Sequence, residues 1–97
     1  AFGPAGAFHA ATAVAHEVLH CLGASDKYDG AGHAIAPGGL PEPGLEPPYP
    51  QRAAELMVGE VALGPASGRL PIGPEELAIG QVTAAEIGWI AAPDAAR

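Results

Sequence analysis

Two histidines four residues apart, with a glutamate beside the first, are the residues of this sequence best suited to chemistry. The run reads His16-Glu17-Val18-Leu19-His20. On an α-helix, residues i and i+4 project from one face, one turn apart, so both imidazoles can bind the same metal ion. Imidazole nitrogens are typical ligands of zinc. Glu17 can reach a water molecule on that ion, and we expect it to act as a general base.

The third metal ligand is expected just beyond the helix that carries the histidines. Gly23 follows His20 by three residues, and Asp26 follows Gly23 by three. A glycine can end a helix in the left-handed conformation at little cost, because it has no Cβ atom. The chain can then bring Asp26 to the ion and leave a fourth position open for water. Asp29 and His33 remain alternative third ligands, because the loop after Asp26 could also return them.

This spacing resembles the H-E-x-x-H-x-x-G-x-x-(H or D) signature of the metzincin zinc peptidases. Aspartate as third ligand is similar to the snapalysin branch, and residues 26–29 are similar to immune inhibitor A-type bacterial peptidases. Metzincins carry a methionine-containing turn beneath the metal, which residues 55–59 resemble, with Met57 the only methionine in the chain. The resemblance covers residues 8–60. It implies hydrolysis of peptide bonds with Zn²⁺ as cofactor.

The resemblance also implies a tyrosine that helps to polarise the substrate carbonyl. Some metzincins place it two residues after the turn methionine, where this chain has Gly59. We therefore expect Tyr28 to take that part as a catalytic residue beside Glu17. Tyr49 is the weaker alternative.

The chain is short for a complete enzyme of this kind. Its 97 residues allow one domain, over residues 1–97, and only 15 of them precede His16. The resemblance implies a twisted sheet before the metal helix, whose edge strand pairs with the substrate backbone. We therefore expect a zinc-peptidase-like domain that is the C-terminal part of a larger catalytic domain. A preceding segment or a partner chain would supply the sheet.

The charge of the chain argues against two classes of partner. Eleven acidic and four scattered basic residues give a formal net charge of −7. Because no basic patch exists, we expect no binding to nucleic acid or to an anionic membrane surface. No apolar run reaches transmembrane length. The expected partner is a peptide or protein substrate, and secretion is suggested by the family resemblance alone.

A helix over residues 8–22 is expected to carry the two histidines. Alanine is abundant there and neither Pro nor Gly interrupts the run, while residues 1–7 read as an irregular lead-in. Val14, Val18 and Leu22 share one face, which we expect to be buried. Cys21 is expected to point away from the metal and to pack in the core.

The middle of the chain is expected to hold only short elements. Residues 30–50 contain five Gly and six Pro, which predict a long loop without a helix or a long strand. Residues 51–58 favour a short helix that places the methionine turn. Residues 60–72 favour a weak hairpin, and residues 75–79 a helical turn.

A C-terminal helix is predicted from a capping box, with Thr83 as N-cap and Glu86 at the third helical position. Trp89 and Ile90 are expected to pack against the metal helix. The whole pattern predicts an α+β, mainly helical fold that resembles the C-terminal part of a zincin catalytic domain. Its parts are an active-site helix, a Gly/Pro-rich loop, the methionine turn and the C-terminal helix.

Three functions are compatible with these features. The first is a zinc metallopeptidase. The second is a catalytically inactive, zinc-stabilised module that binds peptides or proteins and derives from a peptidase. The third is a metal-free helical interaction domain in which the motif is accidental. Glu17 favours the first, because a binding module does not need it, whereas the short segment before His16 favours the second function or a missing piece of the chain.

Overall fold

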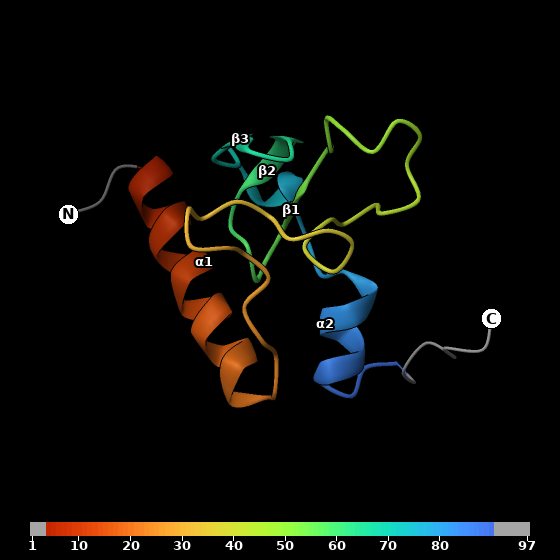
Figure 1. Cartoon of the computed structure of the whole chain (residues 1–97). Coiled ribbons are helices and arrows are strands. Elements are labelled where there is room, and N and C mark those ends of the chain that lie inside the picture. The colour runs from red at the N-terminus through yellow and green to blue at the C-terminus, as the bar shows by residue number, and fades with distance from the viewer. Residues whose placement is uncertain (1–3, 91–97) are drawn as a thin grey trace.

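A computed structural model describes residues 4–90, and within them the chain forms two α-helices, a short 3-10 helix and one four-stranded sheet (Figure 1). The helix α1 lies along one side of the molecule, with the sheet and α2 beside it. The elements are α1 (Pro4–Cys21), β1 (Ala54–Glu55), β2 (Val61–Gly64), β3 (Ser67–Arg69), η1 (Pro74–Glu76), β4 (Leu77–Ala78) and α2 (Gln81–Glu86). Neither α-helix is long and apolar enough to cross a membrane.

The sheet has the strand order β3-β2-β1-β4. The pairs β1–β2 and β2–β3 are antiparallel, whereas β1 and β4 are parallel. The expectation of a mainly helical fold is therefore wrong, because only 29% of the chain is helical and a four-stranded mixed sheet accompanies the two α-helices. The hairpin expected within residues 60–72 is confirmed as β2 and β3.

The prediction of a short helix over residues 51–58 is also wrong. Ala54 and Glu55 instead form β1, where Ala54 pairs with Val61 on one side and with Leu77 on the other. Pairing with two distant strands satisfies the backbone groups of this segment, and such tertiary contacts override local helix propensity. The chain reverses through Gly59, whose φ of 83° is costly for a residue with a Cβ atom.

The helix α1 begins earlier than the predicted residue 8 and ends within one residue of the predicted residue 22. It starts at Pro4, since the first helical turn tolerates a residue without a backbone N–H. At the other end Gly23 has a φ of 110°. The Ala24 N–H donates to the Leu19 carbonyl at 2.9 Å, and the Gly23 N–H to the His20 carbonyl at 3.1 Å. This pair of bonds is the Schellman motif, so the expected glycine end is confirmed.

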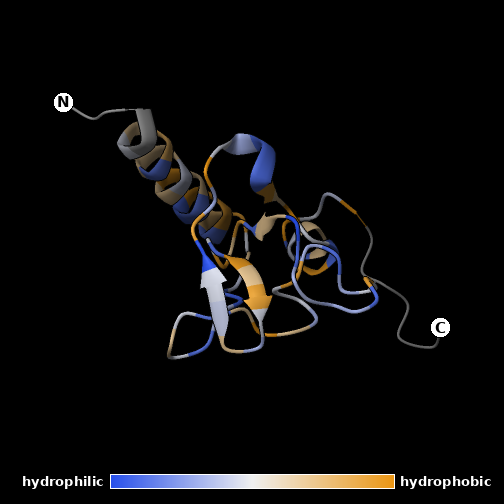
Figure 2. Ribbon diagram, turned by 90° about the horizontal axis from the view of Figure 1, so that it is seen from above, coloured by the Kyte–Doolittle hydropathy of each residue, from blue (hydrophilic) through white to orange (hydrophobic). Residues whose placement is uncertain are grey.

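The apolar face expected to be buried on α1 is exposed. Val14, Val18 and Leu22 keep 63%, 51% and 54% of their surface accessible, and Cys21 is exposed as well. The buried residue on α1 is Leu19, which packs with Met57. Figure 2 shows the cause, because the other described elements lie on one side of α1 only. Helical periodicity identifies apolar stripes but cannot tell which one meets a partner.

The capping box expected at the start of α2 is absent from this helix. The N-cap is Gly80, and Thr83 lies buried inside the helix with no bonded partner for its hydroxyl. Trp89 is 65% exposed and Ile90 is exposed too. The expectation that these two residues pack against α1 is therefore wrong. A tertiary contact fixes the start of this helix, because the Gly80 N–H donates to a buried carboxylate of β1.

The Gly/Pro-rich segment is an ordered loop. Residues 30–50 contain no helix and no long strand, as the sequence predicts. The Gln51 side chain holds the loop through hydrogen bonds to the backbone of Glu42 and Pro48. In Figure 1 residues 40–50 extend away from α1.

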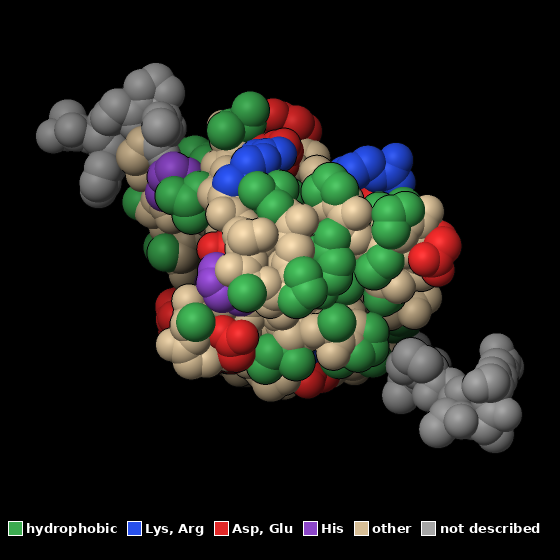
Figure 3. Space-filling model, turned by 45° about the horizontal axis from the view of Figure 1, so that its top comes forward, with side chains coloured by type: hydrophobic (Ala, Val, Ile, Leu, Met, Phe, Trp, Pro, Cys, Tyr) green, Lys and Arg blue, Asp and Glu red, His purple; other side chains and the backbone are tan. Residues whose placement is uncertain are grey.

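On the face shown in Figure 3, Lys and Arg side chains lie in two separate places and form no continuous patch.

Candidate metal centre

Three side-chain atoms meet beside the C-terminal half of α1. The Nε2 atoms of His16 and His20 are 3.0 Å apart. Asp26 Oδ1 lies 3.1 Å from the first nitrogen and 2.8 Å from the second. Ligands of a tetrahedral zinc ion with bonds of about 2.0–2.1 Å are about 3.3 Å apart. The triangle formed by His16 Nε2, His20 Nε2 and Asp26 Oδ1 is therefore close to the size that zinc requires.

The other ring nitrogen of each histidine is held by a backbone carbonyl. His16 Nδ1 donates to the Leu56 carbonyl at 3.0 Å, and His20 Nδ1 donates to the Ala24 carbonyl at 2.8 Å. A carbonyl can only accept, so in the neutral rings the proton sits on Nδ1 and the Nε2 lone pair is free. Such carbonyl partners orient the ligand histidines of metal sites.

The triangle consequently joins three acceptors. Two Nε2 lone pairs and a carboxylate oxygen repel one another at about 3 Å unless a cation lies between them. Two imidazoles and one carboxylate form a ligand set typical of catalytic zinc. Protonation of one histidine is the other way to relieve this repulsion, because a protonated Nε2 donates a hydrogen bond. The Ala24 carbonyl, followed by the charge of Asp26, raises the pKa of His20 against the opposing effect of desolvation.

Local structure explains how these atoms meet. The Schellman turn at Gly23 places the Ala24 carbonyl against His20 and redirects the chain so that Asp26 returns to α1. The next residue is fixed to the methionine turn, because the Lys27 N–H donates to the Met57 carbonyl at 3.1 Å. One helix end and one distant turn thus fix the triangle.

Glu17 lies close to the two histidines and forms with them a group of side chains that could hold a metal ion. One of its carboxylate oxygens is within 4.8 Å of a ring nitrogen of both histidines. Its side chain is exposed and borders a cavity of about 370 Å³. The cavity is lined from α1 by His9, Thr12, Ala13, His16 and Glu17, and from the rest of the fold by Leu56, Gly59, Leu70 and Pro71. Glu17 therefore borders both the histidine pair and this cavity.

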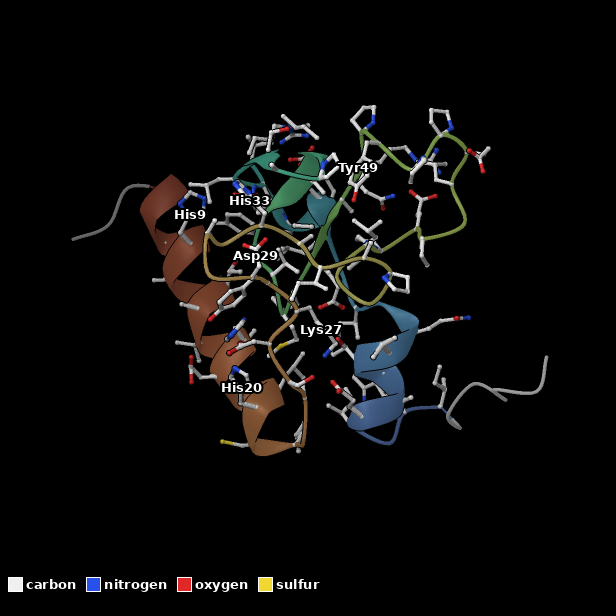
Figure 4. All side chains as sticks on the ribbon, viewed as in Figure 1. His9, His20, Lys27, Asp29, His33 and Tyr49 are labelled. Atoms are coloured by element: carbon white, nitrogen blue, oxygen red, sulfur yellow. The ribbon has the colours of Figure 1, made fainter. Side chains whose placement is uncertain are left out.

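Tyr28 is the aromatic residue that the structure brings to the site. Its ring stacks on His16, with centroids 6.4 Å apart and planes at 29°. The charge of Asp26 raises the pKa of Tyr28, so the phenol keeps its proton at neutral pH and can donate a hydrogen bond. Tyr49 lies elsewhere, since Figure 4 shows it near β2 and far from His20.

The alternative third ligands are engaged in other contacts. The Asp29 carboxylate accepts hydrogen bonds from the N–H groups of Ala31 and His33, at 2.9 and 3.1 Å. These bonds lower the pKa of Asp29. His33 Nδ1 lies 2.9 Å from Glu60 Oε1. In Figure 4 His33 is labelled towards the N-terminal end of α1, whereas His20 lies near the other end. Of the three candidate third ligands Asp26, Asp29 and His33, the structure therefore brings Asp26 to the two histidines.

A buried carboxylate beneath the site was missed by sequence reasoning. Glu55 is fully buried, and its two oxygens accept hydrogen bonds from Met57 N at 2.6 Å and Gly80 N at 2.5 Å. It thereby fixes the turn whose Leu56 carbonyl holds His16. The available signal was a single acidic residue between apolar neighbours, in the run Ala53-Ala54-Glu55-Leu56-Met57.

Comparisons with known proteins identify no relative of this chain. No protein-family model, no curated protein and no solved structure matches the chain. The likeness to metzincins is therefore carried by the short residue pattern alone, and any function must be argued from the geometry of the site.

Proposed function

We propose that this protein is a zinc-dependent peptidase that hydrolyses peptide bonds. The observation that supports the proposal most is the triangle of His16, His20 and Asp26, in which both imidazoles are oriented by backbone carbonyls. A bystander pair of histidines does not need this orientation. The Glu17 carboxylate, which has an oxygen within 4.8 Å of a ring nitrogen of both histidines, supports the proposal of a general base beside the ion.

Each residue has one role in this proposal. His16, His20 and Asp26 would hold the ion, which when bound would acidify a water molecule and polarise the scissile carbonyl. The Glu17 carboxylate accepts the proton of the attacking water and delivers it to the leaving amine. The Tyr28 hydroxyl donates a hydrogen bond to the oxygen on which negative charge develops.

The cavity beside Glu17 suits the substrate residue next to the scissile bond. Ala13, Leu56, Leu70 and Pro71 make much of its lining apolar, and its volume is about 370 Å³. An apolar side chain gains most from such surroundings, because leaving water is favourable for apolar surface. We expect peptides with an apolar residue at that position to be cut faster than those with a charged one.

The alternative is a zinc-stabilised module that binds a peptide or protein without cutting it. The exposed apolar stripe of Val14, Val18 and Leu22 favours this reading, because contiguous apolar surface marks interaction sites. Incubation with a quenched fluorescent peptide library separates the two. A peptidase produces hydrolysis that a chelator abolishes and equimolar zinc restores, whereas a binding module retains zinc and releases no fluorescence.

Replacing Tyr28 with phenylalanine is expected to lower kcat on the order of 100-fold, the usual effect of losing one donor to an oxyanion. Zinc affinity should stay the same, since the hydroxyl is not a ligand. Steady-state kinetics and a zinc titration of the same preparations measure both quantities. The control is Tyr49→Phe, which should match the wild type. Unchanged kcat in Tyr28→Phe would remove this residue from the reaction.

A further inference from the structure

The glutamate at the end of α2 holds both neighbours of Asp26. Glu86 Oε1 accepts hydrogen bonds from the Ser25 backbone N–H at 2.9 Å and from Lys27 Nζ at 2.5 Å. Its other oxygen, Oε2, accepts a bond from the Ser25 hydroxyl at 2.7 Å. One carboxylate from α2 therefore bonds the residues on both sides of Asp26, the candidate third ligand.

The lysine end of this contact is buried, whereas Ser25 and Glu86 are exposed. Lys27 is only 7% exposed, and its ammonium group also donates to the backbone carbonyl and the hydroxyl of Ser25, at 2.7 and 2.9 Å. Charged hydrogen bonds are stronger away from water, and a buried lysine left unpaired is costly. The helix end is also packed closely against the turn, since a Cβ atom added at Gly23 would lie 3.0 Å from the Glu86 carbonyl oxygen.

The Asp26 side chain itself lacks such support. It is 44% exposed and lies in a segment outside any helix or strand. A metal ligand must be held within about 0.5 Å of its productive position by the surrounding structure. The contacts that can do this are those on Ser25 and Lys27.

We propose that Glu86 is a positioning residue of the metal centre. By fixing Ser25 and Lys27, it holds the Asp26 carboxylate against the two histidine Nε2 atoms. This inference rests on the proposed function, since it takes the triangle to be a metal site. It adds a residue from the far end of the chain, which touches neither metal ligands nor substrate.

The test is the zinc affinity of Glu86→Gln, measured by competition with a chromophoric chelator. Glutamine keeps the size of the side chain but loses its charge and one acceptor. Substitutions behind metal ligands typically weaken binding by about 10- to 100-fold, and we expect a loss in that range. The visible spectrum of the Co²⁺-loaded protein should change too, because the ligand geometry changes. A merely structural role would move neither readout in folded protein.

The matched control is Glu76→Gln. Glu76 also accepts two bonds from one cation, Arg69, and one from a backbone N–H, that of Ile72. The pKa of Glu76 and that of Glu86 are both lowered to about 2, against desolvation, by their cationic and N–H partners. Glu76→Gln should lose a similar surface bond network yet bind zinc as the wild type does.

The outcomes separate the two proposals. Wild-type zinc affinity in folded Glu86→Gln overturns the positioning role, whereas a wild type that binds no zinc overturns the proposed function itself. If Glu86→Gln does not fold, Ser25→Ala decides the matter, because it removes only the hydroxyl bonds to Glu86 and Lys27. A several-fold loss of zinc affinity in Ser25→Ala supports the proposal, and an unchanged affinity overturns it.

Discussion

Replacing Glu17 with glutamine is expected to abolish most peptide hydrolysis while leaving zinc bound. Glutamine has nearly the same shape as glutamate, but its amide cannot accept the proton of the attacking water. The ion should remain, because the triangle is made by His16, His20 and Asp26. Loss of a general base typically costs about 10²–10⁴-fold in rate, and we expect kcat/KM to fall at least that far.

The measurement for Glu17→Gln combines hydrolysis of a quenched peptide with metal analysis of the same sample. Glu46→Gln is a suitable control, since Glu46 is an exposed carboxylate in the loop of residues 30–50. It should retain wild-type kcat/KM. Hydrolysis at the wild-type rate by zinc-loaded Glu17→Gln would show that another group takes the proton. Loss of zinc from this variant would instead make Glu17 a ligand.

Removing zinc is expected to lower the stability of the fold by several kcal/mol. An ion that binds only the folded chain stabilises it by about 4 kcal/mol when its free concentration is about 1,000 times its Kd. For a domain of this size, each kcal/mol shifts Tm by roughly 4–8 °C. The effect should be large here, because few side chains are fully buried and the ligands join α1 to the segment after it.

Thermal melting with and without a chelator measures this effect. The wild type should lose more than about 10 °C in Tm on chelation and regain it with zinc. His16→Ala and His20→Ala should melt at the same temperature in both conditions. His9→Ala and His33→Ala are the matched controls and should keep the response, because both histidines lie outside the triangle. An unchanged wild-type Tm would show that the histidine pair holds no stabilising ion.

The parts of the site that the sequence predicts are those fixed within a few residues. Helix geometry alone sets the relation of His16 to His20, and the glycine end of α1 follows from the freedom of Gly23 to adopt a positive φ. Asp26 can come close to the histidines because it follows His20 by only six positions in the sequence. The relation of the two histidines and the glycine end are local properties, whereas the final position of Asp26 also depends on contacts of its neighbours with the methionine turn and with Glu86.

The parts that the sequence does not predict depend on distant partners. Glu86 looks like a capping residue beside Thr83, yet its carboxylate bonds Ser25 and Lys27. Glu55 looks like part of a short helix, yet it lies in a central strand and bonds Gly80 across the fold. Periodicity and capping rules describe the neighbours of a residue in sequence, whereas these roles arise from packing between elements.

The exposed stripe on α1 has a similar origin. Val14, Val18 and Leu22 are as regularly spaced as core residues, but the described elements pack only against the side of α1 that carries Leu19 and the histidines. The tertiary structure therefore decides which face of a helix is buried. Because alanine lies on several faces of α1, the sequence alone does not strongly favour the burial of any one face.

The most direct test of the metal site is the mass of the folded protein under non-denaturing conditions with equimolar zinc. We expect one zinc ion per chain in the wild type. That ion should be lost in His16→Ala, His20→Ala and Asp26→Ala, and kept in Asp29→Asn. A wild-type chain that stays metal-free, or zinc binding that survives all three alanine substitutions, would contradict the proposed site.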